Sequence, residues 1–346
     1  MRLDRDPSII RMAYELKVDL AEGAVRGIIR YCRDKIRAWI REEGGGALDA
    51  AGIEGIVRRK LGLVIEEVWT DSDLDELIAR YVRVGEPVFA TLKVELDAQT
   101  FAALLERVSG RTPADRYVAV VDCRGDKAYR RFFSRWHEIA HLLTLTRQIE
   151  LPFFRCRADQ SATESLMDAI AGELGFPDEV IKPRLEEEHR RTGRLTFAGV
   201  ERVRQETCPE ASFQSMLNAC VVRWPRPILL LEAGMGVKKA ERDAMESSQL
   251  ALVQRTVPQA VLRVLVAISN EAARKSRFRV DKNMAVPVES LVHRIFAGSE
   301  SSTNGEFEGA EDLALWRHSD GAAVGSGAVS IHARHVGARV VALLQR

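Results

Sequence analysis

Two histidines in an apolar segment restrict the fold of this chain more than any other feature of its sequence. His137 and His141 are four residues apart in a segment whose apolar residues follow a helical spacing from 127 to about 146. Residues four apart lie on one face of a helix, so both imidazole rings point the same way. The apolar residues between 139 and 143 predict that this helix is buried, and a buried imidazole needs a polar partner. The fold must therefore bring such a partner to both rings.

The same stretch has the pattern His-Glu-x-x-His, in which two imidazoles can bind a single Zn²⁺ ion. Glu138, next to the first histidine, is placed to reach a water on that ion and to act as the general base. By residue frequencies the pattern arises by chance in roughly one such chain per hundred. The alternative interpretation is two solvated or capped histidines on a surface helix, which the apolar flanks disfavour.

A catalytic zinc site also needs a third protein ligand and one open position. The metzincin arrangement is excluded because its further Gly and His positions are Thr144 and Arg147. Glu164, on a second helix expected over 163–174, is the favoured ligand. Asp168 follows one turn later, where it can accept the outer N–H of a ligand histidine and fix its tautomer. An exchange of roles between these two acids, or a solvated helix face, is the alternative.

These two segments resemble the ImmA/IrrE family of bacterial regulatory zinc peptidases. The similarity is close over 130–144 and 164–177, where Met167-Asp168, Ala171-Gly172 and Pro177 fall at the positions of the family's second signature. The order of elements is similar from about residue 85 to 180. The chain departs from the family just before the first motif, at 132–136.

The resemblance implies a gluzincin-type fold with one Zn²⁺ ion, held by His137, His141 and Glu164, with Glu138 as base. It also implies cleavage of a regulatory protein, typically a helix-turn-helix transcriptional repressor, which releases genes of a stress or anti-phage response. The overall plan is most similar to the CapP-type peptidases of anti-phage (CBASS) operons, for which single-stranded DNA is the implied activator. A non-catalytic DNA- or ligand-responsive regulator with a residual peptidase site is the alternative.

The apolar spacing predicts an α+β fold with two domains. With what the resemblance implies, we expect a zinc peptidase domain over 1–195, and a helical linker with a smaller α/β, GAF-like sensor domain over 196–346. Further helices are expected in about the first 70 residues and over 197–222. Strands are expected over 87–94, 117–122, 228–231 and 277–280, while 261–267 fits a strand or a helix. The segment 328–344 predicts a hairpin that turns at Val336-Gly337.

The composition is that of a globular protein of a reducing compartment. The 346 residues suffice for two domains, and 46% hydrophobic with 29% charged residues can bury a core. A formal net charge of +1 excludes a polybasic coat over the whole chain. The five cysteines form no Cys-x-x-Cys pair, which argues against disulfides and zinc ribbons. We expect a cytoplasmic protein without a membrane segment, because the first residues lack a signal-peptide core and the most apolar stretch, 227–237, is too short to span a bilayer.

Cys156 lies between the two expected metal-binding helices, flanked by Arg155 and Arg157. These arginines would favour its thiolate, which could occupy the open zinc position and inhibit the enzyme. An ordinary loop cysteine is the alternative. Cys123, at the end of a strand, is a weaker candidate for the same role.

A basic cluster surrounds Phe278 in the C-terminal half. Basic residues that follow phosphates, beside aromatics that stack on bases, are what single-strand binding requires. The alternative is a solvated strand face. The expected nucleic-acid contacts are Arg274, Lys275, Arg277 and Arg279.

Overall fold

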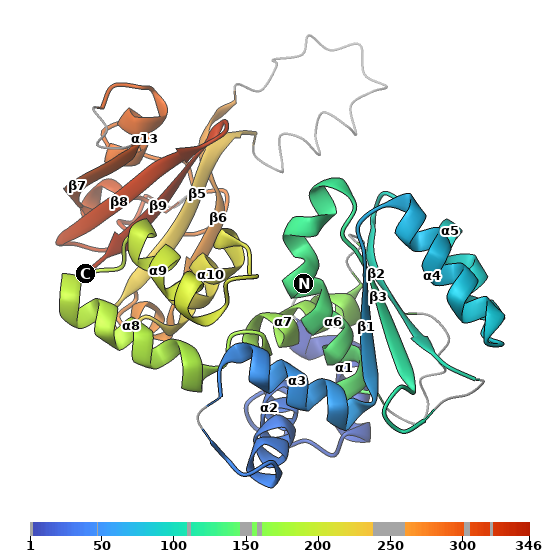
Figure 1. The fold of residues 1–346 in the computed structure, drawn as a ribbon. Helices are drawn as coiled ribbons and strands as arrows, with labels where there is room; N and C mark the ends of the chain where they lie inside the picture. The colour runs from blue at the N-terminus through green and yellow to red at the C-terminus, as the bar shows by residue number, and fades with distance from the viewer. Residues whose placement is uncertain are drawn as a thin grey trace. The chain divides into compact units, whose positions relative to one another are not determined.

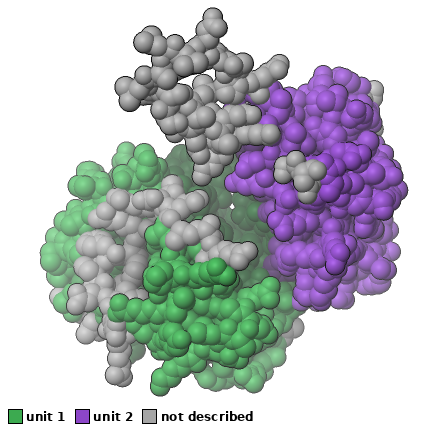
Figure 2. Space-filling model, turned by 180° about the vertical axis from the view of Figure 1, so that it is seen from behind, with its two compact units in different colours: residues 1–181, 202–219 green, residues 182–201, 220–346 purple. Residues whose placement is uncertain are grey.

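The computed structural model describes residues 3–46, 48–108, 112–145, 154–157, 161–237, 260–300, 305–318 and 321–346, with the backbone alone for 154–157. The fold is α+β with two sheets, which confirms the predicted class. The chain divides into two compact units, shown in Figure 2. Unit 1 comprises Met1–Ile181 and Arg202–Ala219, and unit 2 comprises Lys182–Glu201 and Cys220–Arg346.

Unit 1 is built on a mixed four-stranded sheet with the strand order β1-β3-β2-β4. Strand β3 pairs in parallel with β1 and antiparallel with β2, and β2 pairs antiparallel with β4 at the edge. The strands are β1 Leu63–Val68, β2 Thr100–Glu106, β3 Tyr117–Asp122 and β4 Phe154–Arg157. The prediction of a strand over 117–122 is confirmed, and all six of its residues are buried, as expected of a strand covered on both faces.

Helices cover both faces of this sheet (Figure 1). The helices of unit 1 that come before the second metal-binding helix are α1 Pro7–Glu15, α2 Ala24–Glu42, α3 Ala50–Leu61, α4 Asp71–Arg83, α5 Leu92–Glu95 and α6 Arg131–Leu143, with short 3₁₀ turns at Leu3–Arg5, Pro87–Thr91 and Gly125–Arg130. Helix α7, Ala162–Leu174, packs against α6. Both helices predicted around the metal motif are therefore confirmed, with α6 ending at Leu143.

The predicted strand over 87–94 is wrong, because this segment forms a 3₁₀ turn followed by α5. A strand would bury every second residue, but Phe89 and Leu92, three apart, are fully buried while Val94 is 81% exposed. Pro87 at the first position of the turn suits a helical start. These side chains join α4 in a core that covers one face of the sheet.

Three strands of this sheet, β1, β2 and β4, were absent from the sequence prediction. The helical pattern that precedes β1 ends at Gly62, which has a left-handed φ of 64°. A side chain there would also meet the Pro113 carbonyl oxygen at 2.2 Å. Gly62 thus ends α3 and lets the chain enter β1 directly.

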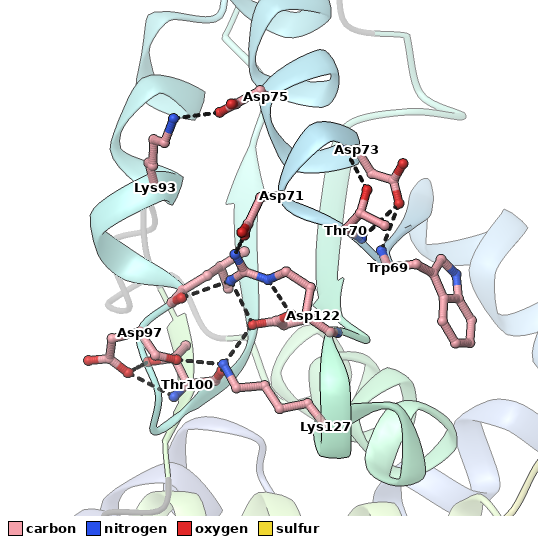
Figure 3. Close-up of polar contacts among 12 residues, drawn as sticks. Trp69, Thr70, Asp71, Asp73, Asp75, Lys93, Asp97, Thr100, Asp122 and Lys127 are labelled. Atoms are coloured by element: carbon pink, nitrogen blue, oxygen red, sulfur yellow. Dashed lines mark hydrogen bonds and ion pairs between the residues drawn. The ribbon is translucent and has the colours of Figure 1, made fainter.

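A buried carboxylate at the end of β3 fixes the turn that leads into α6. Asp122 accepts two hydrogen bonds from the Arg124 guanidinium, at 2.8 and 2.9 Å, and one from Lys127 at 2.6 Å. Lys127 also donates to the Asp97 and Thr100 carbonyls, as Figure 3 shows. Burial alone would raise the pKa of Asp122, but these hydrogen bonds hold it below its usual value. The network therefore connects β3, the approach to β2 and the segment before the metal-binding helix.

Unit 2 contains a five-stranded antiparallel sheet with the order β6-β5-β9-β8-β7. Its strands are β5 Ile228–Gly236, β6 Val261–Ser269, β7 Glu306–Asp312, β8 Ala328–Val336 and β9 Arg339–Gln345. The helices α8 Asp178–Thr192, α9 Phe197–Thr207 and α10 Phe213–Arg223 each cross a boundary between the units, while α12 Glu271–Lys275 and α13 Leu291–Phe296 lie within unit 2. The predicted hairpin is confirmed, with Val336 paired to Arg339, and 261–267 belongs to a strand.

The predicted strand over 277–280 is wrong, because this segment ends α12. The N–H of Phe278 donates to the Ala273 carbonyl at 2.8 Å, which is a helix-capping bond. Phe278 and Val280 are buried in the core of unit 2, as the alternation of apolar and basic residues predicts, but the segment pairs with no strand among the described residues. In the part of the chain that the structure describes, no helix combines the length and apolar character of a membrane span.

Candidate metal centre

Helices α6 and α7 place the predicted metal ligands next to one another. His137 and His141 lie one turn apart on α6, and Glu164 lies in the first turn of α7. Nε2 of His137 is 2.9 Å from Oε2 of Glu164 and 3.2 Å from Nε2 of His141. Nε2 of His141 is 3.6 Å from Oε1 of Glu164. These three side chains form a cluster that could hold a metal ion.

The donor atoms have the spacing that a tetrahedral site needs. Bonds from Zn²⁺ to nitrogen and oxygen are about 2.0–2.1 Å long, so two ligand atoms of a tetrahedral site lie about 3.3 Å apart. The observed separations of 2.9, 3.2 and 3.6 Å fall on both sides of that value. The cluster therefore fits a single ion of this size.

The hydrogen bonding of His137 indicates that a cation belongs at this point. Its Nδ1 atom is 2.9 Å from Oδ1 of Asp168, a carboxylate that can only accept. A neutral ring that donates from Nδ1 has a lone pair on Nε2, and that lone pair faces the Glu164 carboxylate and the His141 ring. Such atoms repel one another at these distances unless a proton or a metal ion lies between them. Asp168 thus holds the position that a tautomer-fixing acid requires.

Glu138 is the second sign of an absent partner. Its side chain is fully buried, and neither carboxylate oxygen has a hydrogen-bond partner within the described residues. Burial raises the pKa of Glu138 to about 8, and the nearby Glu164 adds to this rise while His137 opposes it. A buried polar group without a partner marks a place for a water or an ion. The residues present therefore fit a metal centre.

The charge of Glu164 is well supported. Burial alone would raise the pKa of Glu164, but its close contacts with the His137 and His141 rings lower it to about 2. Ser161 caps the start of α7 by accepting the Glu164 backbone N–H at 3.1 Å, and the N-terminus of a helix stabilises an anionic side chain. Burial lowers the pKa of His141, which favours the neutral form that binds metals.

Arg135 lies on α6, two residues before His137, and is buried among carboxylates of three other segments. Its guanidinium is 3.1 Å from Glu54 of α3 and 2.8 Å from Glu67 of β1, and it also pairs with Glu210. Burial raises the pKa of the Glu54 carboxyl, and the Arg135 charge opposes this rise. These ion pairs connect the metal-binding helix to the rest of unit 1.

Close packing also holds α7 against α6. A side chain at Gly175, which ends α7, would meet Cδ1 of Trp136 at 3.0 Å. Phe132 of α6 packs against Phe176 with ring centroids 5.3 Å apart. The distance between the two metal-binding helices therefore depends on a small residue at 175.

The other predicted site residues lie elsewhere. The backbone of Cys156 is in β4, but its thiol lies outside the described side chains, so its inhibitory role stays a prediction. Cys123 is buried in a small apolar cluster with Ala102 and Val121, and burial raises the pKa of its thiol to about 12. Of the basic cluster in unit 2, three arginines line one cavity, while Lys275 forms an ion pair with Glu271.

The geometry defines a class of site: two histidines and a glutamate that converge on one point, with a buried carboxylate beside them. No family model and no curated protein matches the sequence. The resemblance to the ImmA/IrrE peptidases therefore stays a prediction that depends on the residues of the two motifs.

Proposed function

We propose that the protein is a zinc-dependent endopeptidase in which His137, His141 and Glu164 hold the metal and Glu138 is the general base. The observation that carries this proposal is the convergence of three ligand atoms within 4.8 Å of one another beside a buried, unpartnered carboxylate. A binding module has no need of that carboxylate. Zinc is favoured because two imidazoles and one carboxylate are a donor set of known zinc hydrolases.

Zinc bound at this cluster would polarise the scissile carbonyl and make a water nucleophilic. Glu138 accepts the proton of the attacking water and transfers it to the leaving amine. Asp168 accepts the Nδ1 proton of His137 and so keeps its Nε2 atom available as a ligand. Arg135 and the packing at Gly175 keep the helices that carry these groups in place.

We further propose, from the resemblance alone, that the substrate is a regulatory protein such as a helix-turn-helix repressor. Its cleavage would derepress a stress or anti-phage operon, with single-stranded DNA as the activator. The C-terminal part of the chain would act as a GAF-like sensor domain, and its antiparallel sheet is compatible with such a role.

Metal analysis tests the proposal first. Elemental analysis of the wild-type protein, dialysed without chelator, is expected to give about one zinc per chain, as one tetrahedral site requires. Glu164→Ala should lose most of it, and Glu173→Ala, on the same helix but paired with Arg33, should keep it. A folded wild-type protein without metal would contradict the proposal.

Glu138→Gln then separates catalysis from metal binding. This variant should keep its zinc and fail to cleave a helix-turn-helix repressor that the wild-type protein cleaves, because an amide cannot accept the water proton. A Glu138→Gln variant that still cuts the repressor would contradict the assigned base. A regulatory effect that is fully retained in this variant would favour a non-catalytic regulator.

A further inference from the structure

A cavity of about 770 Å³ lies in unit 2, between the segment after β6 and the connection from β7 to β8. Its volume is within the range of about 300–1,000 Å³ found for small-molecule sites. Its lining is rich in cations and comprises Ser269, Arg274, Arg277, Arg279, Asp281, His318 and Val324. It contains one acidic side chain against three guanidinium groups, so its local charge is positive.

Two of these guanidinium groups have no acidic partner within the described residues. Arg274 donates to the Ser269 carbonyl at 2.6 Å, and no carboxylate of the part of the chain that the structure describes is within ion-pair distance of Arg274 or Arg277. The neighbouring Lys275 differs, since its ammonium is 2.7 Å from Glu271. Lys275 is therefore neutralised by its own helix, whereas Arg274 and Arg277 keep their charge at the cavity.

Arg277 lies where the backbone leaves helix α12. The N–H of Arg277 donates to the Arg274 carbonyl and that of Phe278 to the Ala273 carbonyl, which is a Schellman motif at the end of α12. This motif places Arg277 in the left-handed region with a φ of 56°, where glycine is the favoured residue. Lys17 ends α1 in the same motif with a φ of 57°, so the conformation belongs to the helix end, and glycine can replace Arg277 without backbone strain.

The remaining wall is ordered by a single carboxylate. Oδ1 of Asp281 is 2.7 Å from Arg279, and Oδ2 is 3.1 Å from Nδ1 of His318. Asp281 thus orients both side chains and leaves their other nitrogens available. Guanidinium groups held in this way match the oxygens of a phosphate group, since they donate in a fixed fork.

We propose that this cavity binds a small phosphorylated molecule of about the size of a nucleotide, with Arg274 and Arg277 on the phosphate oxygens. A single strand of nucleic acid fits less well, because strand binding relies on aromatic side chains that stack on bases. The aromatic residue of this cluster, Phe278, is 1% exposed and belongs to the core of unit 2. The site goes beyond the proposed peptidase activity and does not depend on it.

Titration calorimetry with the full chain tests this site, with pyrophosphate and a nucleoside triphosphate as probes. The wild-type protein should bind, and Arg274→Gln and Arg277→Gly should each weaken binding roughly tenfold or more, as expected for a lost charge-assisted hydrogen bond. Lys282→Ala is the matched control, because this exposed neighbour carries the same charge but is not part of the lining. Its affinity should stay within about twofold of wild type.

The glycine variant also guards against misfolding, since glycine suits the left-handed position and should leave the melting temperature unchanged or higher. Chelation of metal ions by the probes is common to all four proteins and cancels in the comparison. No binding by the wild-type protein, or equal losses in Lys282→Ala and Arg277→Gly, would overturn the proposal. Binding of a single-stranded oligonucleotide, without binding of either small probe, would overturn it in favour of nucleic acid.

Discussion

Arg135→Met should destabilise the protein by about 3 kcal/mol. Breaking a buried ion pair by removing one partner costs roughly 3–5 kcal/mol, because the other charge stays buried. Of the three carboxylates around Arg135, Glu54 is only 10% exposed, while Glu67 and Glu210 are 27% and 49% exposed. Water can solvate the two more exposed groups in the variant, so the loss comes mainly from Glu54 and lies at the low end of that range.

Urea denaturation at several pH values measures this loss and identifies its origin. Burial already raises the pKa of Glu54 in the folded wild-type protein, and without Arg135 this pKa rises further. A carboxyl whose pKa is higher in the folded than in the unfolded chain destabilises the fold as the pH rises through that interval. The difference between wild type and Arg135→Met should therefore be large at pH 7 and shrink towards pH 4, where Glu54 is protonated.

Two further variants test whether the unpaired Glu54 charge causes the loss of stability. Glu54→Gln introduced into Arg135→Met should recover part of the lost stability, because the unpaired buried charge is then removed. Arg30→Met, which disrupts a half-exposed ion pair with Glu22, should cost less than about 1 kcal/mol. An equal loss for Arg135→Met at pH 4 and pH 7, or one as small as that of Arg30→Met, would refute the argument.

Three other outcomes follow from the metal-binding helices. Asp168→Ala should lower the zinc affinity roughly tenfold, which is the low end for an acid that orients a ligand, because Asp168 is 50% exposed. Competition with a chelating dye measures the zinc affinity, and an unchanged affinity would exclude the role of Asp168 at His137. Gly175→Ala should lose about 1–3 kcal/mol in urea through its clash with Trp136, whereas Gly172→Ala, with nothing within 4 Å, should be neutral or stabilising. A chelator should lower the melting temperature and added zinc restore it, since the ion binds only the folded chain; an unaffected melting temperature would contradict this.

The helices of the metal centre could be predicted because their signals are local. The spacing of His137 and His141 and the apolar residues around them indicate α6, and the apolar residues between 166 and 171 indicate α7. The partners of Arg135 could not be predicted in this way. Glu54, Glu67 and Glu210 are 81, 68 and 75 residues away in sequence, and no periodic pattern relates them.

The errors in secondary structure arise where packing overrides local preference. Strand β2 consists largely of alanine and leucine, which prefer helices, but it is held between β3 and β4 by backbone hydrogen bonds. The segment 87–94 contains β-branched valines, yet it folds helically because Phe89 and Leu92 fill the core beneath α4. The packing that overrides these local preferences cannot be inferred before the neighbouring elements are known.

The division of the chain into units has a consequence for how the protein comes apart. The polypeptide passes between the units three times, at 181/182, 201/202 and 219/220, so neither unit is a segment that one cut would release. A chain shortened at residue 195 would lack Glu210 and leave Arg135 with two of its three acidic partners.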